Sequence, residues 1–112
     1  TALAYDVQYE IEKVGEGGEL RNDDELASLV AEVAKSVPSC HKVVERKKIG
    51  CSEDFTLLAS RVRARGGKTE FFVVGADRTA AHHQREFDFD EKGMETAFDI
   101  FKGCLLKLNG TE

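Results

Sequence analysis

This sequence of 112 residues lacks the features that mark several large classes of protein. It has no basic excess, because 16 lysines and arginines stand against 21 aspartates and glutamates, and a nucleic-acid-binding domain would favour a basic stripe. No apolar run approaches the ~20 residues that a membrane span needs. No Gly-Lys-Ser/Thr follows Gly15, Gly17 and Gly18, so these glycines do not match a phosphate loop.

Cysteine is also scarce. Cys40, Cys51 and Cys104 are an odd number at wide spacings, and no Cys-x-x-Cys occurs. A disulfide framework or a zinc knuckle is therefore not expected, and free thiols in a reducing cytosol are the default. The prediction is a cytoplasmic protein.

A hydrophobic content of 41% is enough for a core, and the length allows one domain or part of a larger one. The chain does not begin with methionine, and we expect it to be a fragment of a longer protein.

The first element expected is a strand over residues 4–14. Its apolar side chains at Tyr5, Val7, Tyr9 and Ile11 alternate with polar ones, which is typical of a half-buried antiparallel strand. The glycines of residues 15–18 then interrupt it as a hinge would.

Three helices are expected after the hinge. Asn22 is the predicted N-cap of the first, which Pro38 ends, and Ser52 is the predicted N-cap of the second. The second ends at residues 66–67, and an amphipathic helix starting near Asp90 closes the chain.

Two further strands lie between these helices. Residues 43–44 form a short and poor one, and the apolar run 71–74 is typical of a strand buried on both faces. The predicted fold class is therefore α/β, a partial parallel sheet with covering helices in the order βαβαβα, whose first strand belongs to another domain.

His82 and His83 lie in the loop after the run 71–74. Ligands of parallel α/β sheets bind beyond the carboxyl ends of strands, so this loop could supply a metal ligand. The alternative interpretation is a pair of solvated histidines. Adjacent side chains of an extended segment point to opposite faces, so at most one is expected to bind.

The acids beside these histidines have a functional and a structural interpretation. Asp88, Asp90 and Glu91 could add ligands or a general base, but they also suit the start of the last helix. Capping likewise accounts for the acids that follow Ser52, and Cys51 is not expected to be a nucleophile because those acids oppose thiolate formation.

One pattern resembles a known family. Ser-Glu-Asp-Phe-Thr at 52–56, the apolar strand ending in Gly75-Ala76, and His-His-x-x-x-Phe-Asp-Phe-Asp-Glu at 82–91 resemble the C-terminal end of the two-metal aminoacylase and carboxypeptidase-G-type metallopeptidases. Within them the likeness is greatest to the amidohydrolase branch, with hippurate and aminobenzoyl-glutamate utilization hydrolases.

The resemblance implies a domain division and a site. Residues 1–15 would end a lid, or dimerisation, domain, and residues 16–112 would form the C-terminal part of the catalytic α/β domain. The last metal ligand of the family maps onto His83, with His82 as the fallback, and Ser52 and Glu53 would lie near the substrate. The parent would use two divalent ions, zinc or manganese, to hydrolyse an N-acyl or N-aroyl amino acid such as p-aminobenzoyl-glutamate.

The remaining ligands and the general base of the family are absent, so no catalytic residue is assigned within the chain. Alone it should be inactive and bind no metal, since a catalytic zinc needs three protein ligands. The strand at residues 4–14 would lack its partners, so we expect self-association through it. The alternative to a hydrolase fragment is an autonomous α/β binding or interaction module.

Overall fold

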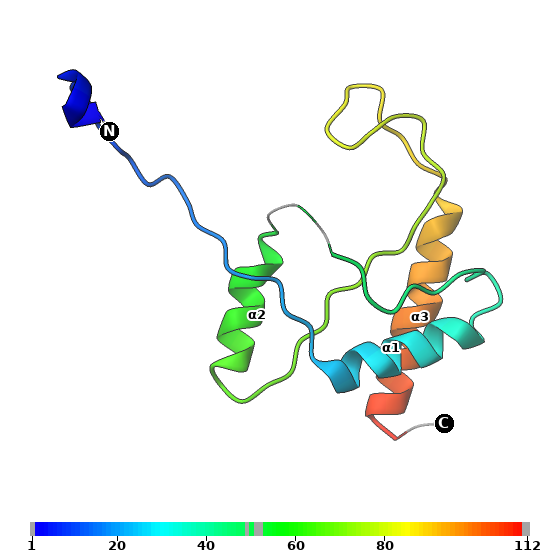
Figure 1. Ribbon diagram of the computed structural model, residues 1–112. Helices are drawn as coiled ribbons and strands as arrows, with labels where there is room; N and C mark the ends of the chain where they lie inside the picture. Colours follow the sequence, from blue (N-terminus) through cyan, green and yellow to red (C-terminus); the bar gives the residue numbers. More distant parts are fainter. Residues whose placement is uncertain (1, 49, 51–52, 111–112) are drawn as a thin grey trace.

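The computed structural model describes residues 2–48, 50 and 53–110, and shows α-helices joined by long extended segments (Figure 1). The elements are a short 3-10 helix η1 (Ala2–Tyr5) and the helices α1 (Asp24–Ser36), α2 (Phe55–Arg63) and α3 (Lys92–Leu108). The molecule is elongated, with extents of 66 × 41 × 19 Å. No described helix is long and apolar enough to cross a lipid bilayer.

Helix α1 starts one residue later than predicted. Its N-cap is Asp23, whose carboxylate accepts a hydrogen bond from the Glu25 N–H at 3.1 Å, so the prediction of Asn22 is wrong. The helix ends at Ser36, directly before Val37 and Pro38, and this confirms proline as the stop signal.

Helix α2 is bound to the chain that leads into α1. The Thr56 hydroxyl accepts a hydrogen bond from the Gly18 N–H at 3.2 Å and donates one to the Glu53 carbonyl at 2.8 Å. Asp54 occupies the N-cap without a side-chain hydrogen bond, and the predicted cap Ser52 lies outside the described residues. Gly66 has φ +81°, a conformation that favours glycine, in the turn predicted to end the helix.

The core lies where α1 crosses α3. Its buried side chains come from these two helices and the residue after α1, and they are Val33, Ala34, Val37, Ile100 and Cys104. Phe72 packs against this cluster and stacks on Phe101, with ring centroids 4.9 Å apart. A salt bridge of 2.7 Å from Lys107 to Glu32 joins the two helices at the surface.

The predicted parallel sheet is wrong, because the described residues contain three α-helices and no strand. Two extended runs, 42–45 and 71–75, lie where strands were expected, but no backbone hydrogen bond between described residues joins them. A sheet needs a ladder of such bonds at a spacing of about 4.8 Å. Strand-like pairing within the described chain is confined to an isolated antiparallel bridge between Arg78 and Phe89.

The run that was expected to be a buried strand is held instead by a side chain. The Asn22 amide accepts from the Phe71 N–H at 3.0 Å and donates to the Phe71 carbonyl at 2.8 Å. The Asp23 N–H also donates to the Thr69 carbonyl at 2.9 Å. Asn22 thus occupies the position that a neighbouring strand would take, and it stops the pairing after one residue.

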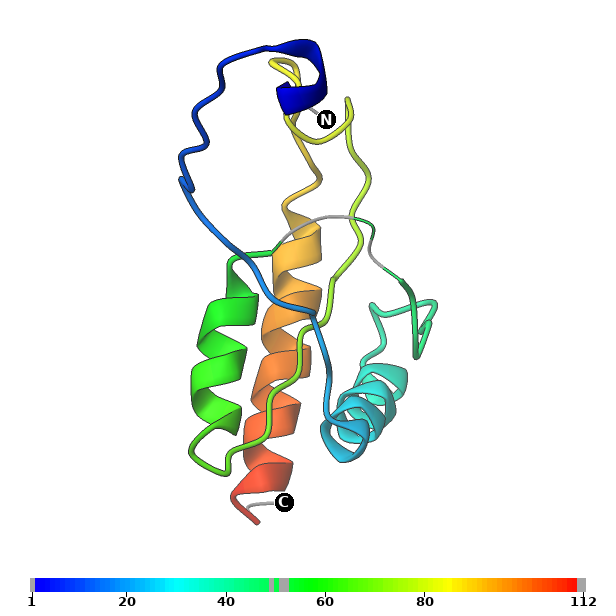
Figure 2. The same cartoon turned by 60° about the vertical axis from the view of Figure 1, so that its left-hand side comes forward.

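The strand predicted over residues 4–14 is likewise not formed. All residues from 4 to 19 are exposed, Tyr5 and Ile11 to 78% and 82%, so no face of this segment is half-buried. The segment leads away from the helices to the N-terminus, as both views show (Figure 1 and Figure 2). Alternation of apolar residues produced the prediction, but a strand needs a partner to bury them.

Candidate functional site

The two predicted histidines lie at the end of a loop that projects beyond the N-terminus of α3 (Figure 1 and Figure 2). Backbone hydrogen bonds close its base, because Asp90 N–H donates to the Asp77 carbonyl at 2.9 Å and Thr79 N–H to the Asp88 carbonyl at 3.0 Å. The Thr79 hydroxyl also donates to the Glu86 carbonyl at 2.7 Å. The loop therefore has a defined base although its side chains are mostly exposed.

The two imidazoles differ in their surroundings. The His82 ring packs on Phe87, with centroids 5.1 Å apart, whereas His83 is exposed and has φ +65°. A non-glycine residue with this φ is uncommon and costs of order 1 kcal/mol, and such residues cluster at functional sites. Gln84 supports the turn, since its side-chain oxygen accepts from the Ala81 N–H at 3.2 Å. The loop thus holds His83 in an outward position and His82 against an aromatic ring.

Two of the neighbouring acids have structural roles. The Asp88 carboxylate accepts from the Phe89 N–H at 2.8 Å, and the Asp90 carboxylate accepts from the Lys92 N–H at 3.0 Å. Both carboxylates therefore stabilise the end of the loop and the start of α3, as the structural interpretation holds.

The described residues do not complete a metal site. Within them, no group of three or more histidine, cysteine, aspartate and glutamate side chains could hold an ion. Glu53 lies at the start of α2, and in the described part of the chain no hydrogen bond, ion pair or ring contact joins it to His82 or His83. Ser52 and Cys51 lie outside the described residues.

A second feature was not predicted. A cavity of about 380 Å³ lies against the side of α1, and residues 39–45, residues 70–75 and α3 complete its wall. Its lining is largely apolar, and it contains Ala31, Val44, Val74 and Ile100. The sequence carries no signal for it, because the wall comes from segments far apart in the chain.

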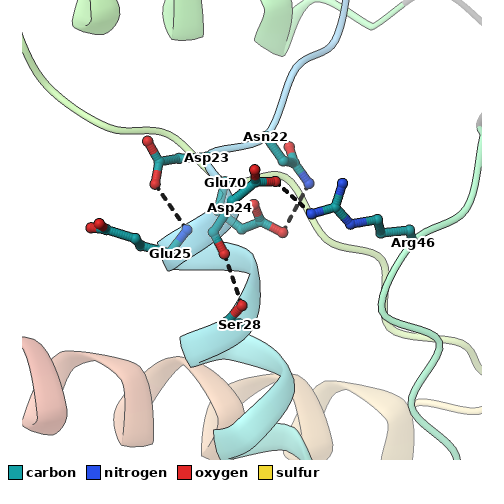
Figure 3. A network of polar contacts seen from close by, with 7 residues as sticks. All are labelled: Asn22, Asp23, Asp24, Glu25, Ser28, Arg46 and Glu70. Carbon is teal, nitrogen blue, oxygen red and sulfur yellow. Dashed lines mark hydrogen bonds and ion pairs between the residues drawn. The ribbon is translucent and has the colours of Figure 1, made fainter.

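Glu70 lines this cavity and carries an unusual carboxyl group. Burial and the charge of Asp23 raise its pKa to about 7 from the ordinary 4.5, although the Asn22 amide and Arg46 act in the opposite direction. The Asn22 amide donates to Glu70 Oε1 at 2.8 Å, and within the described chain Glu70 Oε2 is buried with no hydrogen-bond partner. Figure 3 shows this group, in which Asn22 and Arg46 reach toward Glu70 and Asp24.

Comparison with characterised proteins identifies relatives of one kind. The chain is 41% identical over 107 residues, 96% of its length, to a homolog of p-aminobenzoyl-glutamate hydrolase from Haemophilus influenzae. The chain is homologous to this hydrolase. It is also 36% identical over 69 residues to the indole-3-acetyl-aspartic acid hydrolase of Enterobacter agglomerans, and 32% identical over 79 residues to a chain of the p-aminobenzoyl-glutamate hydrolase of Escherichia coli.

These homologues confirm the resemblance to amidohydrolases of the hippurate hydrolase type. The three alignments cover 61% to 96% of this chain, but only 25%, 16% and 18% of the respective relatives. The chain therefore spans about a quarter of the length of its H. influenzae relative. No protein-family model and no solved structure matches the chain.

Proposed function

We propose that this chain is part of an amidohydrolase that cleaves N-acyl or N-aroyl amino acids, with p-aminobenzoyl-glutamate as the leading substrate. The observation that carries the proposal is the identity of 41% over nearly the whole chain to a p-aminobenzoyl-glutamate hydrolase homolog. The relative from E. agglomerans is named for an acyl aspartate, so an acyl group on an acidic amino acid is common to both names. A cytosolic location suits the free thiols Cys40 and Cys104.

Within this proposal His83 is the metal ligand that the chain supplies, with His82 as the alternative. The support for His83 is its exposure at the end of a loop whose base is closed by hydrogen bonds. His82 is the weaker candidate because its ring already packs on Phe87. The metal would be zinc or manganese, two ions in the complete hydrolase.

The described residues do not hold such an ion by themselves, because they contain no group of three ligand side chains. The other ligands and the general base would therefore come from outside this segment, which spans a minority of each relative. Ser52 and Glu53 remain candidates for contact with the substrate.

The test is hydrolysis by the polypeptide that carries this segment. Purified with zinc or manganese, it should release p-aminobenzoate from p-aminobenzoyl-glutamate, measured by chromatography. Hippurate and indole-3-acetyl-aspartate in parallel would define the acyl and amino-acid preference. Absence of hydrolysis of all three by a folded, metal-loaded protein would refute the proposal.

A further inference from the structure

The exposed N-terminal segment has the form of a β-strand that lacks a partner. Residues 5–11 span about 23 Å when extended, and their apolar side chains alternate along one face. These side chains are exposed to 78%, 55%, 61% and 82% in the order Tyr5, Val7, Tyr9 and Ile11. So many exposed apolar residues in one segment mark an interaction site.

The cavity beside α1 offers a complementary surface. Its floor includes Val30, Ala31 and Ala34 of α1 and Ile100 of α3, and the extended runs 42–45 and 72–75 contribute to its lining. The run 71–75 spans about 17 Å, so it can pair with a strand of about five to seven residues. Val44 and Val73 at the opening are themselves exposed to 59% and 68%.

The two extended runs have backbone groups that remain available. Within the described residues, the N–H and C=O groups of 43–44 and 72–74 make no hydrogen bond, whereas those of Phe71 are bonded to Asn22. Available backbone groups beside an apolar floor are what an added strand requires.

Charge also favours this pairing. The polar face of the N-terminal segment carries Asp6, Glu10 and Glu12. The stretch that forms one side of the cavity and continues from it is basic, with Lys42, Arg46, and the lysines at 47 and 48 against Glu45. Opposite charges along the two segments would favour docking and its register.

We propose that residues 5–11 of a second copy of this chain dock in the cavity beside α1, along residues 42–45 and 72–75. The apolar face of the strand covers α1, and its backbone pairs with the available groups of the two runs. The exchange is reciprocal, which gives a two-fold dimer, and the glycines of residues 15–18 supply the hinge. The inference does not depend on the proposed hydrolase activity.

The first test is the molar mass of the full chain in solution, measured by light scattering over a range of concentrations. The wild-type chain should be a dimer, and Val44→Glu should shift it to a monomer because the new charge lies in the cavity and repels the acidic strand. Leu58→Glu is the matched control, since Leu58 is equally exposed, at 58%, but lies on α2 away from the cavity lining. Circular dichroism verifies that both variants keep their helices.

The second test uses Cys40, which lines the cavity and is partly accessible. In a Cys51→Ser background, Val7→Cys or Tyr9→Cys should form a disulfide with Cys40 of the other copy under mild oxidation. Gln8→Cys, on the opposite face of the strand, should not. Cys40→Ser should abolish the cross-link, and mass spectrometry of peptides identifies the pair.

Each outcome decides for or against the exchange. A cross-linked species of dimer mass that depends on Cys40 and on the apolar face supports it. A wild-type monomer, a dimer that Val44→Glu leaves intact, or equal cross-linking of Gln8→Cys would overturn it. A Cys40 disulfide within one chain would show that the strand folds back on its own copy, and would also overturn it.

Discussion

At the scale of single residues, Glu70 has a carboxyl group whose pKa is strongly raised by the fold. Its pKa of about 7 lies above the ordinary 4.5, so between these values the folded state binds more protons than the unfolded one. The stabilising protonated form is present below pH 4.5 and is lost as the pH rises through 7. Stability should therefore fall over that window.

Replacement of Glu70 by glutamine should remove this dependence. The amide keeps an oxygen to accept from Asn22 but carries no charge, so Glu70→Gln should stabilise the chain at pH 8 by about 1 kcal/mol after allowance for solvent screening. Urea unfolding at pH 5 and pH 8 measures it. Glu86→Gln, an exposed acid in the histidine loop, is the control, and equal effects of the two substitutions would contradict the assignment.

The two histidines give a second prediction at this scale. In the complete hydrolase, His83→Ala should lower activity by about 100-fold or more and reduce metal content, because loss of one ligand disrupts an ion that needs at least three. His82→Ala should cost less, since that ring packs on Phe87. Activity and metal analysis of both variants check this, and a larger loss for His82→Ala would make His82 the ligand.

At the scale of elements, the contact between α1 and α3 depends on a glycine. A Cβ added at Gly103 would lie 2.6 Å from Val33 Cγ1, and Val33 is 2% exposed. No real Cβ accepts that distance, so the two helices would have to separate or the valine to move. The absence of a side chain at Gly103 is what lets α1 approach α3.

Gly103→Ala should therefore destabilise the chain. Overpacking costs about 1–3 kcal/mol, which exceeds the gain of roughly 1 kcal/mol in helix propensity. In a Val33→Ala background, which provides space at the same contact, the substitution should become neutral or stabilising. Thermal unfolding of the four proteins measures the coupling, and a Gly103→Ala effect that is the same in both backgrounds would show that the steric contact is not its cause.

At the scale of the whole molecule, the elongated shape and the long extended segments leave the described chain without a complete catalytic site. The histidine loop contributes at most one ligand under the proposal, and the relatives are several times longer than the part that aligns with this chain. Activity should accordingly belong to the complete hydrolase and not to this segment.

The isolated chain should show no hydrolysis of p-aminobenzoyl-glutamate or hippurate, even with zinc or manganese added. One ligand cannot position an ion and its bound water. A sensitive chromatographic assay, with His83→Ala as the comparison, measures this. Reproducible turnover that disappears in His83→Ala would show that the segment holds more of the site than its described side chains indicate.

Local signals in the sequence were sufficient for the helices, the loop and the family. Apolar residues at helical spacing and Pro38 placed α1 and α3 closely, because a helix satisfies its backbone hydrogen bonds within its own segment. The loop at 77–89 and the likeness to amidohydrolases also followed from short patterns, and the homologues confirm the latter.

The tertiary structure decided what depends on residues far apart in the chain. Extended runs at 43–44 and 71–74 predicted a sheet, but a strand requires a partner, and Asn22 takes the backbone groups of Phe71 instead. The cavity and the raised pKa of Glu70 arise in the same way, from α1 and residues 39–45 and 70–75 brought together. Periodicity shows which side chains prefer burial, whereas the partner that buries them is set by the packing of the whole chain.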